Sequence, residues 1–118
     1  MPSSARHVQQ ALHNYAVYQY LNASSQPATD WQVTMLFYAA LHYVDAYLGK
    51  MNVHPRSHED RDAYVSVVAD LRRVASSYLQ LRDRSMDARY LRRDLPPAIV
   101  VDMHAYYVRL RDQLAPRI

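Results

Sequence analysis

The chain has 118 residues, a formal net charge of +3, one glycine and no cysteine. A chain of this length can bury roughly two-thirds of its unfolded surface, so a single domain over residues 1–118 needs no disulfide or structural metal. The lack of cysteine excludes disulfide frameworks, thiolate zinc sites and cysteine nucleophiles. One glycine, Gly49, is too few for the glycine-rich loops of phosphate-binding and nucleophile-elbow motifs.

The first seven residues lack the apolar stretch of a secretory signal peptide. No run of about 18 apolar residues predicts a membrane span. A chain without cysteine is also compatible with a reducing compartment. We therefore expect a cytoplasmic protein that has no membrane partner.

Helical periodicity and the scarcity of turn residues predict an all-α fold. The first helix is expected from about Ser4 to Leu21, before the breaker-rich segment 22–27. Its apolar positions recur at helical spacing at Val8, Ala11, Leu12, Tyr15 and Leu21.

The second helix is apolar almost all the way round. Thr29 or Asp30 is expected to cap its start, and Gly49 to take the left-handed position just past its end. One side carries Val33, Leu36, Phe37, Ala40, Leu41, Val44 and Leu48, and the other carries Met35, Tyr38, Ala39, Tyr43, Ala46 and Tyr47. A helix with so little polar surface belongs in the middle of a bundle or in a dimer interface.

The second half of the chain predicts two or three more helices. Ser57, followed three residues on by Asp60, resembles a capping pair, and Tyr64, Val68, Leu71 and Val74 or Ala75 follow on one face. Ser76 and Ser77 mark either a break or weak helix, so residues 78–90 form either a separate fourth helix or a continuation. The last helix begins at Pro96 and Pro97, runs through Ile99 or Val100, Met103, Tyr107, Leu110 and Leu114, and ends at Pro116.

Arginine carries the positive charge, because Lys50 is the only lysine. One stretch holds Arg72, Arg73, Arg82, Arg84, Arg89, Arg92 and Arg93. The planar guanidinium suits phosphate recognition and stacking on bases, which favours a nucleic-acid or nucleotide surface over residues 82–93. The alternative is a solvated face, in which Arg84 pairs with Asp87 and Arg89 with Asp94.

Most of the eleven tyrosines are better explained as core residues, since Tyr15, Tyr64 and Tyr107 lie on apolar stripes. Tyr90 is the exception. It lies between Arg89 and Arg92, and we expect it to contact the ligand of this surface.

Histidines supply the remaining chemistry. His42 and Asp45 are spaced to share a helix face, and His54 and His58 flank the turn at Pro55, so a folded site could use them as a base or as metal ligands.

The spacing of these residues is weakly specific. The proline and the cap at Ser57 keep His54 and His58 from acting as a helical ligand pair, and with Glu59 as the only glutamate the Glu-x-x-His pairs of di-metal bundles are missing. We therefore expect no metal and no other cofactor. His42 is then a hydrogen-bonded core residue, and His58 orients its loop or contacts an anion.

Three segments together resemble the HEPN superfamily of small helical domains. They are residues 37–48, the pair Ser57 and His58, and residues 81–90, and the similarity spans roughly Trp31 to Leu114. The resemblance implies an antiparallel bundle of four to five helices that forms a homodimer. It also implies a role in toxin–antitoxin, antiviral or other RNA-directed systems.

Active HEPN nucleases carry an Arg-x(4–6)-His motif, and here this chain departs from the family. The fifth residue after Arg84 is Arg89, and His104 lies far beyond it. A guanidinium stays protonated and cannot act as an ordinary general base. We therefore expect binding of RNA, a nucleotide or a protein partner without catalysis, through Arg82, Arg84, Arg89, Tyr90, Arg92 and Arg93.

Two alternatives stay open. One is a metal-independent endoribonuclease with a non-standard site, for which His58 and Arg84 are the candidate catalytic residues. The other is a structural protein-interaction module, in which the same arginines pair with acidic residues of a partner.

Overall fold

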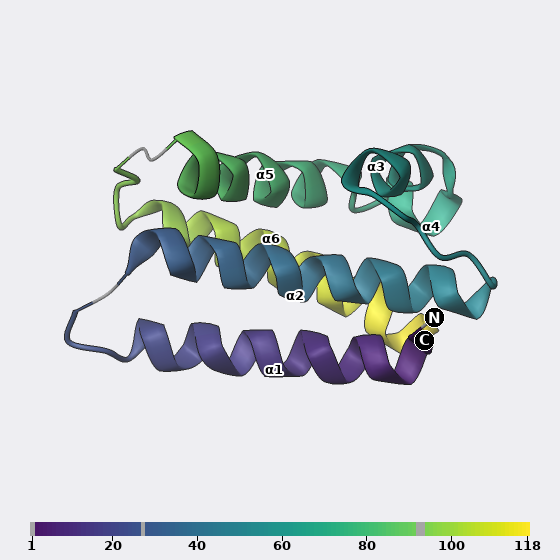
Figure 1. Cartoon of the computed structure of the whole chain (residues 1–118), viewed down its shortest axis with the longest axis horizontal. Helices are drawn as coiled ribbons and strands as arrows, with labels where there is room; N and C mark the ends of the chain where they lie inside the picture. The colour runs from purple at the N-terminus through teal and green to yellow at the C-terminus, as the bar shows by residue number, and fades with distance from the viewer. Residues whose placement is uncertain (1, 27, 92–93) are drawn as a thin grey trace.

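The computed structural model describes residues 2–26, 28–91 and 94–118, and every regular element in them is helical (Figure 1). This confirms the predicted all-α helical bundle. The α-helices are α1 (Ser4–Asn22), α2 (Thr29–Lys50), α3 (His58–Val67), α4 (Ala69–Arg72), α5 (Ala75–Met86) and α6 (Ile99–Leu114). A π-helical turn, η1 (Asp87–Leu91), follows α5, and a 3₁₀ turn, η2 (Ala115–Arg117), follows α6.

Helix α2 is the centre of the bundle. It lies between α1 on one side and α5 on the other, with α6 against it (Figure 1). Its buried residues point in all directions round the helix, as expected from its sequence. Although α2 is apolar, none of the helices in the described part of the chain is long and apolar enough to cross a membrane.

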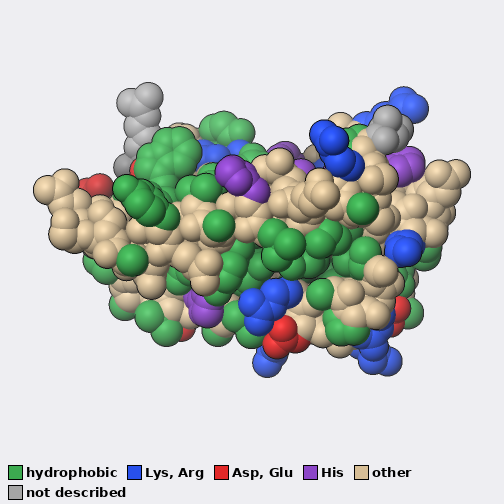
Figure 2. Space-filling view, turned by 90° about the horizontal axis from the view of Figure 1, so that it is seen from below, with side chains coloured by type: hydrophobic (Ala, Val, Ile, Leu, Met, Phe, Trp, Pro, Cys, Tyr) green, Lys and Arg blue, Asp and Glu red, His purple; other side chains and the backbone are tan. Residues whose placement is uncertain are grey.

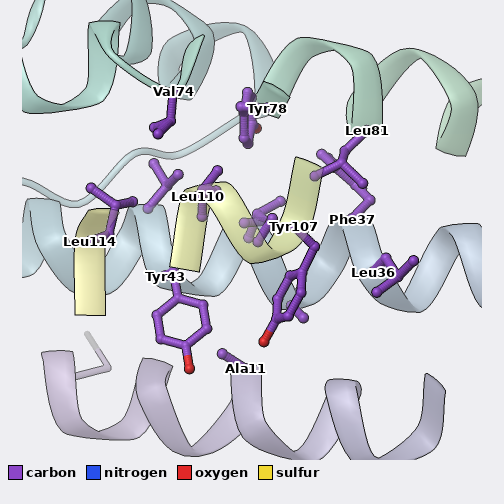
Figure 3. Packing of buried hydrophobic residues seen from close by; sticks show 14 of the residues in the cluster. Ala11, Leu36, Phe37, Tyr43, Val74, Tyr78, Leu81, Tyr107, Leu110 and Leu114 are labelled. Carbon is purple, nitrogen blue, oxygen red and sulfur yellow. The ribbon is translucent and has the colours of Figure 1, made fainter. Parts of the chain in front are cut away.

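Large side chains from three helices fill the core around α2. Phe37 on α2 and Tyr78 on α5 are fully buried, and their ring centres lie 5.8 Å apart. On the other side of α2, the rings of Tyr43 and Tyr107 point toward α1, where Ala11 lies (Figure 3). The small side chain of Ala11 leaves room for these rings between α1 and α2 (Figure 3).

Helix α1 turns only part of its predicted stripe inward, since Ala11 is buried and Tyr15 packs against the core. Its buried residues are Ala11, Asn14 and Tyr18, whereas the side chain of Leu12 is 55% exposed. Asn14 accepts a hydrogen bond from Gln10, so its polar group is satisfied at this position. The expected stripe was wrong at Leu12 because two polar-tipped residues occupy the inner face instead.

The start of α2 also differs from the prediction. Ala28 is the N-cap residue and makes no side-chain cap, while Thr29 and Asp30 already lie in the first turn. The amide of Gln32 donates to the carbonyl of Ala28 over 2.9 Å, so the helix begins one residue earlier than a cap at Thr29 would require. In the first turn Asp30 still suits the positive end of the helix dipole.

Gly49 does not take the left-handed position predicted for it. It lies inside α2, and among the described residues the one with positive φ is Asn52, at 57°. Ser4 Oγ donates to the carbonyl of Ala46 over 2.7 Å, and a Cβ added to Gly49 would lie only 2.8 Å from the same Oγ. Glycine is therefore used here for the close approach of α1 to α2, not for its backbone freedom.

The predicted cap of α3 is confirmed. Ser57 Oγ accepts from the amide of Asp60 over 3.0 Å, and the Asp60 carboxylate accepts from the amide of Arg56 over 3.2 Å. The helix then breaks at Val68, whose ψ of 126° is extended. Residues 78–90 therefore do not continue α3.

The helix break that the sequence suggests at Ser76 and Ser77 falls earlier in the chain. Both serines lie in the first turn of α5, where Ser77 is buried. The last helix is confirmed, but it begins at Ile99 and not at the two prolines. Pro96 and Pro97 precede the helix, and their carbonyls accept the amides of Ile99 and Val100. Helix α6 buries Val100, Met103, Tyr107, Leu110 and Leu114, and Pro116 lies in the 3₁₀ turn that follows the helix.

Candidate arginine and histidine sites

The first candidate site is built around Arg89 in the π-helical turn. Its Nη1 donates to the hydroxyl of Tyr38 over 2.7 Å and to that of Tyr90 over 3.3 Å, and its Nε donates to Ser85 Oγ over 3.0 Å. The guanidinium carbon lies 5.2 Å from the ring centre of Tyr38 and 4.8 Å from that of Tyr90. These bonds and cation–π contacts fix the guanidinium plane. We call Tyr38, Arg89 and Tyr90 the Arg89 platform.

The outer part of this platform is open to solvent. The side chain of Tyr90 is 67% exposed, whereas Tyr38 is half-buried on α2. π-helical turns occur frequently at functional sites, where they re-aim side chains. Here the turn presents Tyr90 outward while Arg89 reaches back to α2.

Two other predicted arginines, Arg82 and Arg84, have carboxylate partners. Arg84 Nη1 lies 2.7 Å from Asp87 Oδ2, which is the pairing expected for a solvated face, and the Arg84 side chain is 38% exposed. Arg89 does not pair with Asp94 in the described residues, because its donors reach Ser85 and the tyrosines instead. The predicted pairing is thus confirmed for Arg84 with Asp87 and wrong for Arg89 with Asp94.

Arg82 faces the middle of α3. Its Nε lies 3.0 Å from Asp62 Oδ2 in an ion pair without an aligned hydrogen bond, and its Nη1 lies 3.8 Å from Asp83. Burial raises the pKa of Asp62, and the charge of Arg82 opposes that rise. Arg92 and Arg93 lie outside the described residues.

His58 is the first residue of α3, and its ring faces α2. The ring centres of Phe37 and Tyr38 lie 5.9 and 6.4 Å from that of His58. Tyr38 therefore lies next to the His58 ring and also accepts a hydrogen bond from Arg89. This places the predicted histidine at the inner edge of the Arg89 platform.

The protonation of His58 follows from this position. Burial lowers its pKa, and the positive charges of Arg61, Arg89 and Arg82 lower it further, while Asp62 opposes them. Arg61 Nη1 lies 3.4 Å from His58 Nδ1. The imidazole is therefore neutral at pH 7 and retains the lone pair of a base or hydrogen-bond acceptor.

The second candidate site joins α1 to α2. His42 and Asp45 lie together on α2, as their spacing predicts, and His7 comes to them from the first turns of α1. Nδ1 of His7 lies 3.0 Å from Nδ1 of His42. Burial is the main cause that lowers the pKa of both imidazoles.

His7 was missed by the sequence reasoning. It is 35 residues from His42 and lies in no motif. Only the antiparallel packing of α1 on α2, which the contact of Ser4 with Ala46 fixes nearby, brings the two rings together.

Asp45 is held by a second partner that the sequence did not indicate. Arg61 Nε donates to Asp45 Oδ1 over 2.7 Å and Arg61 Nη2 donates to Oδ2 over 3.1 Å. The two side chains are each 9% exposed, so this bidentate pair is screened from water. We call His7, His42 and Asp45, with Arg61 behind them, the histidine–aspartate cluster.

No known family, curated protein or solved structure matches this chain. Its function must therefore be inferred from the chemistry of the Arg89 platform and the histidine–aspartate cluster.

Proposed function

We propose that this chain is a HEPN-like, non-catalytic domain that binds single-stranded RNA, as a homodimer, in a toxin–antitoxin or other defence system. One observation carries the binding proposal: the exposed ring of Tyr90 is stacked on the guanidinium of Arg89. Unpaired bases of RNA stack on aromatic rings and on arginine planes with little dependence on sequence. The outer face of the Tyr90 ring suits such a base.

The charges beside the ring support binding of a phosphate backbone. Arg84 lies one helical turn before the platform, and its half-exposed side chain has Asp87 as its partner. An RNA phosphate competes with that carboxylate for the guanidinium, because both are anionic acceptors that a guanidinium can bind through two donors. The competition predicts modest affinity with a clear dependence on salt.

The same contacts argue against catalysis at Arg89. Its donors bind Tyr38, Tyr90 and Ser85, and a guanidinium cannot accept a proton at neutral pH. Arg89 therefore orders the stacking surface, while Tyr90 and Arg84 contact the RNA.

Fluorescence anisotropy with a labelled single-stranded RNA, in buffer containing EDTA, tests this assignment. We expect Tyr90→Ala to weaken binding about tenfold, because one base stacked on an aromatic ring contributes about 1–3 kcal/mol. Tyr90→Phe retains the ring and should bind like the parent. Tyr20→Ala is the matched control, since Tyr20 on α1 is 78% exposed and lies outside the platform. Equal effects of Tyr90→Ala and Tyr20→Ala contradict the proposal.

A metal-independent endoribonuclease is the second candidate, and the position of His58 favours it. The imidazole is held neutral beside Tyr38, close enough to Arg89 and Arg82 for their charges to lower its pKa. In this alternative, His58 removes the proton from the 2′-hydroxyl, whose oxygen bonds to phosphorus as the bond to the 5′-oxygen breaks. The leaving 5′-oxygen takes a proton from water, and Arg84 stabilises the charge that develops on the phosphate.

RNA cleavage in EDTA distinguishes the two functions. Cleavage by the parent that His58→Ala abolishes and His13→Ala preserves would replace the binding proposal with the enzymatic one; His13 is an exposed histidine on α1. If the parent neither cleaves nor binds RNA of several classes, the protein-interaction module remains. Light scattering of the purified chain tests the homodimer separately.

A further inference from the structure

We propose that His7, His42 and Asp45 bind a single divalent transition-metal ion, for which Zn²⁺ is the best-fitting ion. One potential ligand atom from each of the three residues lies within 4.8 Å of the others. The site goes beyond the RNA-binding function, because none of its residues belongs to the Arg89 platform.

The two imidazoles already have nearly the separation that a metal requires. Two nitrogens that each lie about 2.0–2.1 Å from a tetrahedral Zn²⁺ are about 3.3–3.4 Å apart. In this protein Nδ1 of His7 and Nδ1 of His42 are 3.0 Å apart. A shift of a few tenths of an ångström would let one ion replace the shared hydrogen bond.

The protonation of the pair also suits a metal. Burial lowers the pKa of His7 and of His42, so both rings are neutral at pH 7. A neutral imidazole that binds through Nδ1 carries its proton on Nε2. Metal binding therefore moves one proton from the Nδ1 hydrogen bond to Nε2 and needs no histidine to lose a net proton.

Asp45 supplies the carboxylate of the site. Arg61 occupies one lone pair on each of its oxygens, and each oxygen has another. Carboxylates that bind metals commonly accept hydrogen bonds from such outer partners, which fix their orientation. The guanidinium also brings a positive charge near the ion, so we expect weaker binding than at a structural zinc site.

Space for an ion and its waters lies beside these side chains. His7 and Asp45 line a small cavity of about 80 Å³ together with His54. His7 and His42 also line a larger hollow of about 630 Å³ on the α1 side. Figure 2 shows the face on the α1 side, where histidine side chains lie at the surface. Because His7 and His42 line the larger hollow, solvent ions can reach their imidazoles, and water can complete the coordination.

The choice of ion follows from the ligands. Imidazole nitrogens favour zinc and its neighbours in the first transition row, whereas Mg²⁺ and Ca²⁺ prefer sites made of oxygen. Two histidines and one carboxylate also leave positions for water on the ion.

Isothermal titration of the untagged full chain with Zn²⁺ at pH 7.5, and the visible absorption of added Co²⁺, test the site. The parent should bind one ion per chain and give a tetrahedral Co²⁺ spectrum. His7→Ala and His42→Ala should each weaken Zn²⁺ binding by more than about tenfold. His13→Ala, an exposed histidine of α1 outside the cluster, should bind as the parent does, and Mg²⁺ should not bind.

Thermal unfolding gives a second readout that separates a missing ligand from a disrupted fold. Zn²⁺ should raise the Tm of the parent and of His13→Ala, and should leave the Tm of a folded His7→Ala unchanged. Absence of saturable binding by the parent would overturn the proposal, and so would a His7→Ala variant that binds like His13→Ala. Since the RNA measurements contain EDTA, failure of the metal site leaves the RNA proposal standing, and the reverse also holds.

Discussion

In and beside the Arg89 platform the charged groups come from one short stretch of chain and lie at a half-exposed surface, whereas the charged pair of the histidine–aspartate cluster joins α2 to α3 and is buried. Arg84 and Asp87, beside the platform, are three residues apart, and Arg84 is 38% exposed. Asp45 and Arg61 are sixteen residues apart, and each side chain is 9% exposed.

This contrast shows that charge density along a sequence is a poor guide to which charges stabilise a fold. Exposed pairs are screened by water and add little, whereas breaking a buried pair leaves a charge without compensation. The exposed pair of Arg84 with Asp87 can therefore be broken at little cost, while Asp45 and Arg61 are tied to the packing of α2 and α3.

The largest difference should appear when each pair is broken. Asp45→Ala leaves Arg61 buried without its carboxylate, and we expect the free energy of unfolding to fall by about 3–5 kcal/mol. Arg84→Ala removes a half-exposed partner and should cost at most about 1 kcal/mol. Urea unfolding followed by circular dichroism measures both. Similar losses in the two variants would contradict the contrast between the clusters.

A smaller effect is expected where α1 approaches α2 next to His7. In Gly49→Ala the new Cβ lies 2.8 Å from Ser4 Oγ, so the hydroxyl must move and give up its bond to Ala46. In the Ser4→Ala background no hydroxyl stands in the way. A double-mutant cycle should therefore give a coupling energy of about 0.5–2 kcal/mol. Gly49→Ala should lower the free energy of unfolding less in the Ser4→Ala background than in the parent. Additive effects would show that the Ser4 hydroxyl does not limit how closely α1 packs against α2.

The smallest effect concerns pH at the inner edge of the platform. Because the pKa of folded His58 lies below its ordinary value of 6.5, the unfolded chain binds the proton first as pH falls. Its contribution to stability is therefore complete above pH 6.5 and is lost as pH falls through that value toward the folded pKa. His58→Asn should show a shallower loss of unfolding free energy between pH 7.5 and 5.5 than the parent. An unchanged slope would mean that neither burial nor the charges of Arg61, Arg89 and Arg82 lower the pKa of this imidazole.

The features that sequence predicted well depend on neighbours along the chain. The cap of Ser57 by Asp60, the pairing of Arg84 with Asp87 and the stripe of α6 each arise within a few helical turns. The apolar character of α2 is equally local, and it correctly predicted a central helix.

The features that sequence could not predict depend on packing between helices. His7 joins His42 only because α1 packs antiparallel to α2, and Gly49 is needed only because Ser4 approaches it. Arg89 contacts Tyr38 and not its predicted partner Asp94, and this too follows from the packing of the π-helical turn on α2. Periodicity carries no information about such distant pairs.

The proposed RNA surface is tested most sharply by the salt dependence of binding. We expect Arg84→Ala combined with Arg89→Ala to weaken binding, because Tyr90 loses its support. The slope of log K against log salt should flatten by about 0.7, the value for one phosphate of a single strand that Arg84 no longer neutralises. Arg72→Ala combined with Arg73→Ala removes the same charge from two other exposed arginines and should keep the parent slope. A flattened slope in the first variant alone is the predicted result, and equal slopes in the two double variants would contradict RNA binding at this surface.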